Sequence, residues 1–230
     1  MKAPAKEEVQ KILEKTLFAQ ALSKKEIDLL AGKMKVISFA KGETIFKQGS
    51  VISDYAVLMT GMCKTTVENP SNGNGTIISF IKPIDIIGIW SLEDTVFAAT
   101  ATALADSVVV FFDKKDVSQL MLTNGKFCYR IFETLCSHAR KTVRQSVDFS
   151  QKSIMSRVAS SLLYIMGEIT DGDCINLPIS RNDLAEYSGI ATGSTIRLLS
   201  ELEKANVVLL DKKTIWIKDI EALKKISLQD

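Results

Sequence analysis

Histidine and clustered cysteine are nearly absent from this sequence, which limits the catalytic and metal sites that it can build. The 230 residues include one histidine, His138, so a catalytic or metal cluster based on histidine within one subunit is excluded. The four cysteines form no C-x-x-C pair, and metal binding usually needs tighter clusters. Cys128 and Cys136 are two helical turns apart, which favours packing on one helix. We therefore expect no metal site.

A strong charge imbalance and a long hydrophobic run are also missing. The formal net charge is only +2, so the overall charge does not indicate a nucleic-acid partner. No apolar stretch reaches the roughly 18 residues that span a bilayer. The N-terminal MKAPAKEEVQKILEK is too charged for a signal peptide and is typical of a helix start. We expect a cytoplasmic protein with no membrane partner.

Enzyme motifs are absent as well. The sequence has no nucleophile elbow, no glycine-rich phosphate-binding loop and no paired carboxylates in a recognisable motif. We therefore expect no enzymatic activity. Hydrophobic residues make up 46% of the chain and charged residues 24%, which is ordinary for a globular protein with a real core.

The first half of the chain predicts short helices followed by a small antiparallel barrel or jelly roll. Residues 5–31 show helical spacing, with Ser23 and Glu26 in the pattern of a capping box. From Met34 to Phe112, six short runs are rich in β-branched and aromatic residues: MKVISF, ETIF, YAVLMT, CKTTVE, TIISFI and SVVVFF. Turn residues separate them, and many short strands at close spacing are typical of a sandwich or barrel.

Residues 114–150 return to a helical period. Their apolar positions form a long stripe that we predict to be a dimer seam, although packing against the barrel fits nearly as well. The predicted seam residues are Cys128, Phe132, Leu135, Ala139 and Val143. Between residues 126 and 157 there are seven Lys or Arg and two Asp or Glu, a local charge of +5, which we interpret as a solvated helix face.

The C-terminal segment predicts a winged helix-turn-helix. A helix over 153–167 and a short strand, CINLPI, precede ISRNDLAEYSGIATGSTIRLLSELEK, and the two strand-like runs of VVLLDKKTIWIKD follow it. Ser180 is a good N-cap for a helix over 181–187, Ala185 is small where a second helix crosses, and Gly189 suits a turn that needs a positive φ. On the second helix, we expect Ile196, Leu199 and Leu202 to be buried.

The opposite face of that second helix carries small hydrogen-bonding groups and one arginine, which suits the major groove. The predicted DNA-binding residues are Ser180, Arg181, Thr192, Ser194, Thr195, Arg197, Lys204, Lys212 and Lys213. Residues 179–230 contain eight Lys or Arg and eight Asp or Glu, so charge alone does not strengthen this prediction. The expected fold class is α+β, with a barrel sensor domain over 1–113, a dimerisation helix over 114–150 and a winged helix-turn-helix over 151–230.

These segments together resemble the Crp/Fnr family of transcription regulators over nearly the whole chain. KGETIFKQGSVISDYAVLMTG resembles the turn pattern of the family's barrel, and IKPIDIIGI resembles the turn before its effector pocket. The 124–150 helix corresponds to the family's dimerisation helix, and ISRNDLAEYSG with TIRLLSELEK resembles its DNA-reading unit. The resemblance implies three partners: duplex DNA with a two-fold symmetric site, a second copy of the chain, and RNA polymerase.

The effector region departs from the cyclic-AMP-binding members of that family. Those members place a Glu after the pocket glycine and an Arg-Ser pair some ten residues later, whereas here Ile89 follows Gly88 and VFAATATAL (96–104) has no Arg. A buried cyclic phosphate without a cation is poorly matched, so cyclic AMP is not the expected effector. An apolar effector, or none, fits better. The predicted pocket residues are Gly88, Ile89, Trp90, Ser91, Thr100, Thr102, Tyr129 and Phe132.

Two other cofactors of the family can be judged from the same residues. Iron–sulfur members carry an N-terminal cysteine group, and no cysteine precedes Cys63, so we do not expect a cluster. Haem members use a histidine in or near the barrel, and His138 keeps a haem-dependent gas sensor as an alternative.

The second helix of the predicted helix-turn-helix, which reads DNA in this family, also departs from the family's pattern. Thr192 and Gly193 occupy the places where many members carry an Arg and a Glu, and only Arg197 matches the later Arg. The expected function is a homodimeric DNA-binding regulator with an unidentified effector. The other alternative is a ligand-binding or protein-interaction module whose winged helix does not read DNA.

Overall fold

The computed structural model describes residues 19–68, 75–92, 94–169, 179–211 and 214–229. Two compact units emerge, one comprising Met1–Glu68 with Ile81–Arg140 and the other Asn69–Phe80 with Lys141–Asp230. The N-terminal part of the helical prediction over 5–31, the strand CINLPI up to Pro178 and the wing lysines Lys212 and Lys213 lie outside the described residues.

The first unit is built mainly of antiparallel strands, as the alternating apolar runs predict. One sheet has the order β1-β8-β3-β6, and β2, β7 and β4 pair side by side in the other. The strands of this part of the chain are β1 (Lys35–Phe39), β2 (Thr44–Phe46), β3 (Asp54–Thr60), β4 (Cys63–Glu68), β5 (Gly75–Ile81), β6 (Ile86–Ile87), β7 (Thr100–Ala103) and β8 (Ser107–Asp113). Of these, β5 belongs to the second unit up to Phe80. The six predicted strands are therefore confirmed, while β6 and β7 were not predicted.

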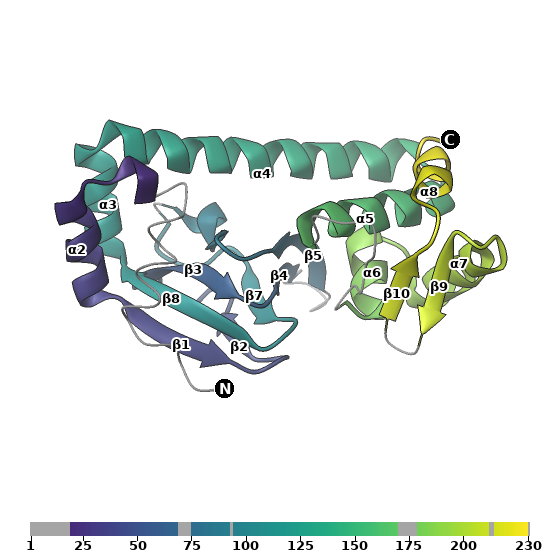
Figure 1. The fold of residues 1–230 in the computed structure, drawn as a ribbon, viewed down its shortest axis with the longest axis horizontal. Helices are drawn as coiled ribbons and strands as arrows, with labels where there is room; N and C mark the ends of the chain where they lie inside the picture. The colour runs from purple at the N-terminus through teal and green to yellow at the C-terminus, as the bar shows by residue number, and fades with distance from the viewer. Residues whose placement is uncertain (1–18, 69–74, 93, 170–178, 212–213, 230) are drawn as a thin grey trace. The chain divides into compact units, whose positions relative to one another are not determined.

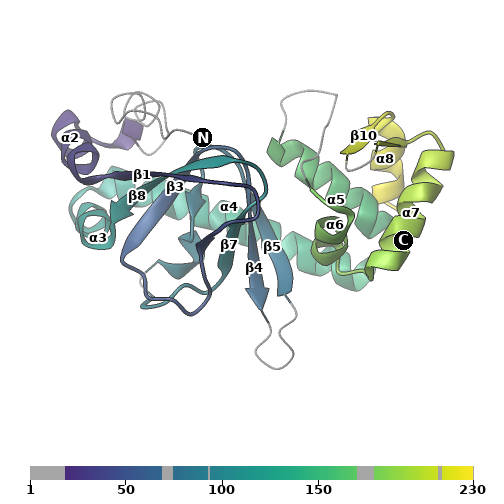
Figure 2. The ribbon, with the colours of Figure 1, turned by 90° about the horizontal axis from the view of Figure 1, so that it is seen from below.

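Strand β8 shows why the barrel needs helices around it. Its apolar residues are all buried, and successive side chains point to opposite faces of a strand. Val109 and Phe111 join the core between the two sheets, whereas Val108, Val110 and Phe112 join a second core on the outer face. That outer face is covered by α2 (Lys24–Lys33), α3 (Lys114–Thr123) and the first part of α4 (Gly125–Gln151). Figures 1 and 2 both show α2 and α3 beside β1 and β8.

The continuous helix predicted over 114–150 is wrong at one residue, Asn124, which separates α3 from α4. Its backbone is extended, at φ −119° and ψ 95°. Its Oδ1 accepts hydrogen bonds from the backbone N–H groups of Lys126 and Phe127, both at 3.1 Å, and its Nδ2 donates to the Ala21 carbonyl at 3.0 Å. An asparagine that caps the next helix competes with helix continuation, which explains the break.

Besides the residues of β5 up to Phe80, the second unit consists of helices and one hairpin. Its elements are the end of α4, α5 (Ile154–Ile169), α6 (Arg181–Ser188), α7 (Thr192–Lys204), β9 (Val208–Asp211), β10 (Thr214–Ile217) and α8 (Ile220–Ser227). Val158, Leu162 and Ile165 of α5 are fully buried and form the apolar face of that helix. Two short 3₁₀ turns, η1 (Ala19–Ala21) and η2 (Ile89–Ser91), lie in the first unit.

Candidate nucleic-acid interface

The turn between α6 and α7 has the geometry that the sequence predicts. Ser180 caps α6 in a complete capping box, in which its Oγ accepts from the Asp183 N–H at 3.0 Å while the Asp183 carboxylate accepts from the Ser180 N–H at 2.8 Å. Gly189 ends α6 in the left-handed region, at φ 63° and ψ 39°. Ala185 is 1% exposed, as expected for a small residue beneath a crossing helix. Both helix ends are therefore fixed by local chemistry.

The buried face of α7 corrects the prediction. Thr195, Leu198, Leu199 and Leu202 are buried at helical spacing, whereas Ile196 is 44% exposed. Thr195, predicted to face DNA, is fully buried and its Oγ1 donates to the Ala191 carbonyl at 3.3 Å. This internal hydrogen bond lets a threonine occupy a core position without an unsatisfied hydroxyl.

The exposed face of α7 retains the arginine. Arg197 has 65% of its side chain exposed, and its closest charged partner is Glu201 at 3.5 Å, a surface pair that contributes little stability. Thr192 begins α7 and its Oγ1 donates to the Asn182 Oδ1 of α6 at 2.9 Å. Gly193 is exposed, and a Cβ built there would meet nothing within 4 Å. This face is open to close approach by a partner.

The N-terminus of α7 is electrostatically favourable for a phosphate. Its N-cap, Ala191, makes no side-chain capping bond, and no acidic residue occupies its first turn. The free backbone N–H groups and the positive end of the helix dipole then point at whatever approaches, and DNA phosphates are commonly held in this way.

The remaining predicted DNA-binding residues lie around this helix pair. Ser180 is exposed at the N-cap of α6, Arg181 is half-buried as its first residue and Ser194 is half-buried in α7. Lys204 is exposed at the end of α7. The hairpin β9–β10 follows, with Leu210 opposite Ile215 and Leu209 opposite Trp216, so the predicted wing is confirmed as a hairpin.

The predicted effector pocket is filled by aromatic side chains on one side. Gly88 adopts a φ of 83°, and a Cβ there would lie 3.0 Å from Cε1 of Phe97. Phe97 stacks on Phe46 with ring centroids 4.0 Å apart. Ile89 and Ser91 are each 1% exposed, and the Ser91 Oγ accepts from the Ala98 N–H at 2.8 Å. Ile89 and Phe97 therefore belong to a buried core of the first unit.

The other pocket residues are spread over the first unit. Thr100 and Thr102 lie on β7, where the Thr100 Oγ1 accepts from the Gln48 N–H at 3.1 Å. Tyr129 and Phe132 lie on α4 and are 59% and 60% exposed. The structure therefore brings Gly88–Ser91 together but leaves the two aromatic residues of α4 facing solvent.

His138 and Trp90 form a buried contact between α4 and the barrel. The imidazole of His138 is 5% exposed, its Nε2 lies 3.8 Å from Oδ1 of Asp85, and its ring meets the Trp90 ring edge-on with centroids 6.0 Å apart. A histidine engaged with a carboxylate and an indole is a packing element, which does not favour an axial haem ligand. Within the described ranges, no group of three or more His, Cys, Asp or Glu residues is placed to hold a metal ion.

Helix α4 carries the predicted seam. Phe132 and Val143 are 60% and 63% exposed, Ala139 is exposed and Cys128 is half-buried. Leu135, in contrast, is partly buried against the barrel core. Val147, which continues the same apolar stripe in the sequence, is 45% exposed on this helix. None of the helices that the structure describes is long and apolar enough to cross a membrane.

Two family models match the chain. Residues 36–124 match the cyclic nucleotide-binding domain and residues 156–226 match the Crp-like helix-turn-helix domain. These matches cover the barrel with α3 and the α5–α8 segment. The first contains the Gly88 turn and the second contains Gly189 and the whole of α7.

Curated relatives and solved structures agree with these models. The chain is 21% identical over 183 residues to the transcriptional activator protein FnrA of Stutzerimonas stutzeri, covering 78% of this chain and 75% of that protein. It is 19% identical over 220 residues to a CRP-like cAMP-activated global transcriptional regulator of Mycobacterium tuberculosis, covering 94% and 98%. The structure of FixK2 from Bradyrhizobium japonicum superposes with a TM-score of 0.78 at 19% identity, covering 86% of this chain and 98% of that one.

Proposed function

Because this chain is a transcription regulator of the Crp/Fnr family, we propose that it acts as a homodimer that binds a two-fold symmetric duplex site through α7. The observation that carries the proposal is the α6–Gly189–α7 unit, whose second helix presents an uncapped N-terminus and the exposed Arg197. A recognition helix in a helix-turn-helix places its N-terminal residues against base edges in the major groove. We infer a cytoplasmic location and no enzymatic activity.

The expected contacts divide by chemistry. Arg197 has the reach and the planar donor geometry to bind a guanine edge with two hydrogen bonds. Ser180, Arg181, Lys204 and the first-turn amides of α7 suit phosphate contacts, which position the helix without reading sequence. Lys212 and Lys213, at the tip of the hairpin in sequence, are proposed as further phosphate contacts.

Substituting Arg197→Ala tests the proposal on a duplex from the upstream region of the protein's own gene. A base contact predicts a loss of about 1–3 kcal/mol on the specific site and little on random DNA. Glu201→Gln is the matched control, because it breaks the same 3.5 Å ion pair but keeps the arginine. Its DNA affinity should be unchanged or higher. Equal affinity of Arg197→Ala and the wild type at matched salt would favour the protein-interaction alternative.

We further infer that cyclic AMP is not an effector of the barrel. Residues 88–104 contain no lysine or arginine that would balance a cyclic phosphate, and the Phe46–Phe97 stack lies against Gly88. Burial of an unpaired phosphate charge is costly, whereas an apolar group fits this lining. An apolar effector that displaces or repacks these rings, or no effector, is therefore favoured.

A further inference from the structure

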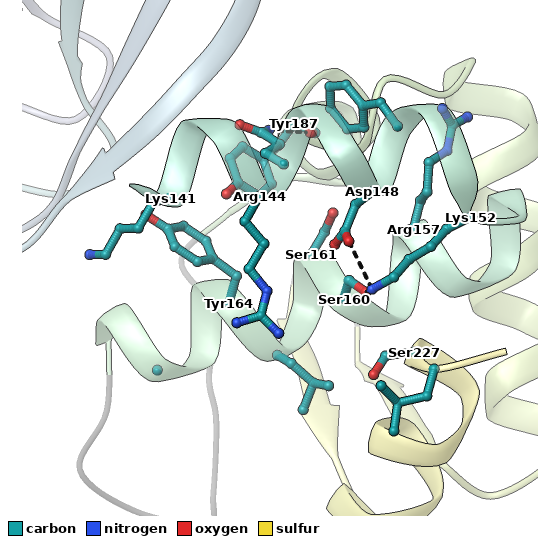
Figure 3. Close-up of a pocket in the computed structure, with 15 residues that line it drawn as sticks. Lys141, Arg144, Asp148, Lys152, Arg157, Ser160, Ser161, Tyr164, Tyr187 and Ser227 are labelled. Carbon is teal, nitrogen blue, oxygen red and sulfur yellow. Dashed lines mark hydrogen bonds and ion pairs between the residues drawn. The ribbon is translucent and has the colours of Figure 1, made fainter. Parts of the chain in front are cut away.

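A basic pocket lies within the second unit, away from the exposed face of α7. It has a volume of about 400 Å³ and is lined by the end of α4, by α5, by Tyr187 of α6 and by the last residues of α8 (Figure 3). Its charged lining residues are Lys141, Arg144, Asp148, Lys152 and Arg157, which is four cations and one carboxylate, a net charge of +3. The sequence predicted a solvated helix face for these cations, but the structure gathers four of them around one hollow.

The cations of the pocket differ in how far they are already neutralised. Lys152 pairs with Asp148 at 3.0 Å and donates to the Ser160 Oγ at 2.8 Å. The side chain of Arg144 makes neither a hydrogen bond nor an ion pair with any residue that the structure describes. Figure 3 shows its side chain reaching from α4 toward α5, between Tyr164 and Ser160 in that view. Its guanidinium is therefore the cation that is free to take an anion.

Aromatic groups form a wall of the same pocket. Tyr164 and Tyr187 are stacked with ring centroids 5.3 Å apart and planes 20° apart, and both line the hollow. The ammonium of Lys141 lies over the Tyr164 ring, 5.6 Å from its centroid. Phe149 also lines it, and the guanidinium of Arg157 lies over its ring at 5.6 Å from the centroid. A site with cations, hydroxyls and aromatic faces suits an organic anion better than a bare inorganic ion.

We propose that this pocket binds a small organic phosphate, with the phosphate held by Arg144 and Ser160 and the organic part beside the aromatic wall. A guanidinium binds phosphate through two parallel hydrogen bonds, which a lone lysine does not match. Asp148 opposes anion binding, because its carboxylate repels the phosphate and already neutralises the Lys152 ammonium. The volume of about 400 Å³ lies within the usual range for small-molecule sites.

The lining residues also hold the turn of the helix-turn-helix. Gln145 Nε2 donates to the Tyr187 carbonyl at 3.0 Å, and the Ser188 Oγ donates to the Ser161 Oγ at 2.9 Å. The Nη2 group of Arg157 lies 3.4 Å from the Gly189 carbonyl, to which it donates. A ligand that moves these side chains changes the support of α6 and hence of α7. This regulatory consequence rests on the DNA-binding function proposed above, whereas anion binding itself does not.

Calorimetric titration of the full chain with phenyl phosphate and with inorganic phosphate, at near-physiological salt, tests the site. We expect saturable binding that is tighter for phenyl phosphate, because only that probe has a ring to place on the aromatic wall. Arg144→Gln should weaken binding about tenfold, since it removes a charge-assisted bidentate contact. Asp148→Asn should strengthen binding severalfold, since it removes the opposing carboxylate.

Arg140→Gln is the matched control, because Arg140 lies on α4 one turn before Arg144 but does not line the pocket. This variant loses the same single positive charge, and its affinity should stay close to that of the wild type. An equal loss in Arg140→Gln and Arg144→Gln, or no saturable binding, would overturn the proposal and leave only general electrostatic attraction.

Duplex DNA separates the two sources of phosphate. If DNA displaces phenyl phosphate, and Arg144→Gln weakens DNA binding on all sequences with a shallower salt dependence, the pocket holds a DNA phosphate and the small-molecule proposal is wrong. If phenyl phosphate binds and leaves DNA affinity unchanged, the result supports the binding site but contradicts its proposed effect on α7. The titration with phenyl phosphate does not depend on DNA binding. The pocket proposal and the DNA-binding proposal can therefore be contradicted independently.

Discussion

The rings of Phe46 and Phe97 stack with centroids 4.0 Å apart and planes 23° apart, beside the left-handed turn at Gly88. Phe46 ends β2, and Phe97 lies before β7, so the stack joins two segments that are about fifty residues apart in the sequence. A stacked pair of this kind adds about 0.5–1.5 kcal/mol beyond the area that it buries. Any effector that enters beside Gly88 must displace or repack it.

This stack leads to the first prediction, that cyclic AMP does not stabilise the barrel. A ligand at a hundredfold excess over its Kd stabilises a protein by about 2.7 kcal/mol. For a chain of this size that corresponds to a rise of about 5–10 °C in Tm. We expect no measurable rise with millimolar cyclic AMP in differential scanning calorimetry. A rise of several degrees would contradict the argument from the missing cation and would require donors elsewhere in the barrel.

Most of the fold could be predicted because the hydrophobic residues recur with clear helical or strand periods. Strand β7 could not be predicted in this way. The run Thr100–Ala103 is made of small residues and lacks the large alternating side chains that indicate a strand. Its pairing is decided by its neighbours, since Thr102 lies opposite Thr44 of β2 on one side and Lys64 of β4 on the other. Tertiary pairing therefore overrides a weak local signal here.

The site was predicted less completely, and α7 shows why. Leu199 and Leu202 fit a helical stripe that begins at either Thr195 or Ile196, and hydrophobicity alone favours the isoleucine. The structure selects Thr195, whose hydroxyl is satisfied inside the helix. The basic pocket has no local signature at all, because its lining comes from four helices between Lys141 and Leu228.

The second prediction concerns Gly193, which lies in the first turn of α7, where an added Cβ would meet nothing within 4 Å. Since glycine in a helix costs up to about 1 kcal/mol relative to alanine, Gly193→Ala should raise the free energy of unfolding by up to that amount. The added methyl also stands on the exposed face, so we expect weaker DNA binding despite the higher stability. Urea unfolding and DNA titration measure the two effects.

Gly32 provides the control for that substitution. It lies in α2, and a Cβ there also meets nothing within 4 Å. Gly32→Ala should stabilise its helix similarly but leave DNA affinity unchanged. If Gly193→Ala binds DNA as well as the wild type does, α7 does not approach DNA closely at this residue.

The third prediction concerns Cys63. Burial raises the pKa of its thiol to about 12, and a hydrogen bond with Ser107 opposes this shift only in part. The thiolate is the reactive form, so iodoacetamide at mildly alkaline pH should leave Cys63 unmodified in the folded protein and should modify it once the protein is unfolded in urea. Peptide mapping by mass spectrometry checks this, and rapid modification of Cys63 would contradict the burial argument.

The same shift has a consequence for stability at high pH. In the unfolded chain the Cys63 thiol ionises at about pH 8.5, whereas in the folded protein it keeps its proton until about pH 12. Between these values the unfolded state binds fewer protons, so the free energy of unfolding falls as the pH rises. Cys63→Ala removes this contribution, and its stability should therefore fall less steeply than that of the wild type between about pH 8.5 and about pH 10.

The last prediction concerns the dimer, which we place on the exposed apolar residues of α4. Tyr129, Phe132, Cys136, Ala139 and Val143 follow one another at alternating spacings of three and four residues, which is the spacing of a coiled-coil seam. Tyr129, Phe132 and Val143 are 59%, 60% and 63% exposed in the single chain. A second copy of the helix would bury them.

Phe132→Asp is the substitution that tests this seam. A carboxylate in the centre of an apolar dimer interface is desolvated without a partner, so we expect dissociation to a monomer of 25.3 kDa in sedimentation velocity. Leu135→Asp is a poorer choice, because Leu135 packs partly against the barrel core and its loss would also damage the sensor domain.

Leu122→Asp is the control for the added charge, since Leu122 is 83% exposed at the end of α3 and lies outside the seam. This variant should keep the mass of the dimer. A Phe132→Asp protein that sediments as a dimer, with its helix content intact by circular dichroism, would place the interface elsewhere on the chain. The two-fold symmetry of the expected DNA site would then have to come from that other contact, because a dimer matches a symmetric operator only through its own two-fold axis.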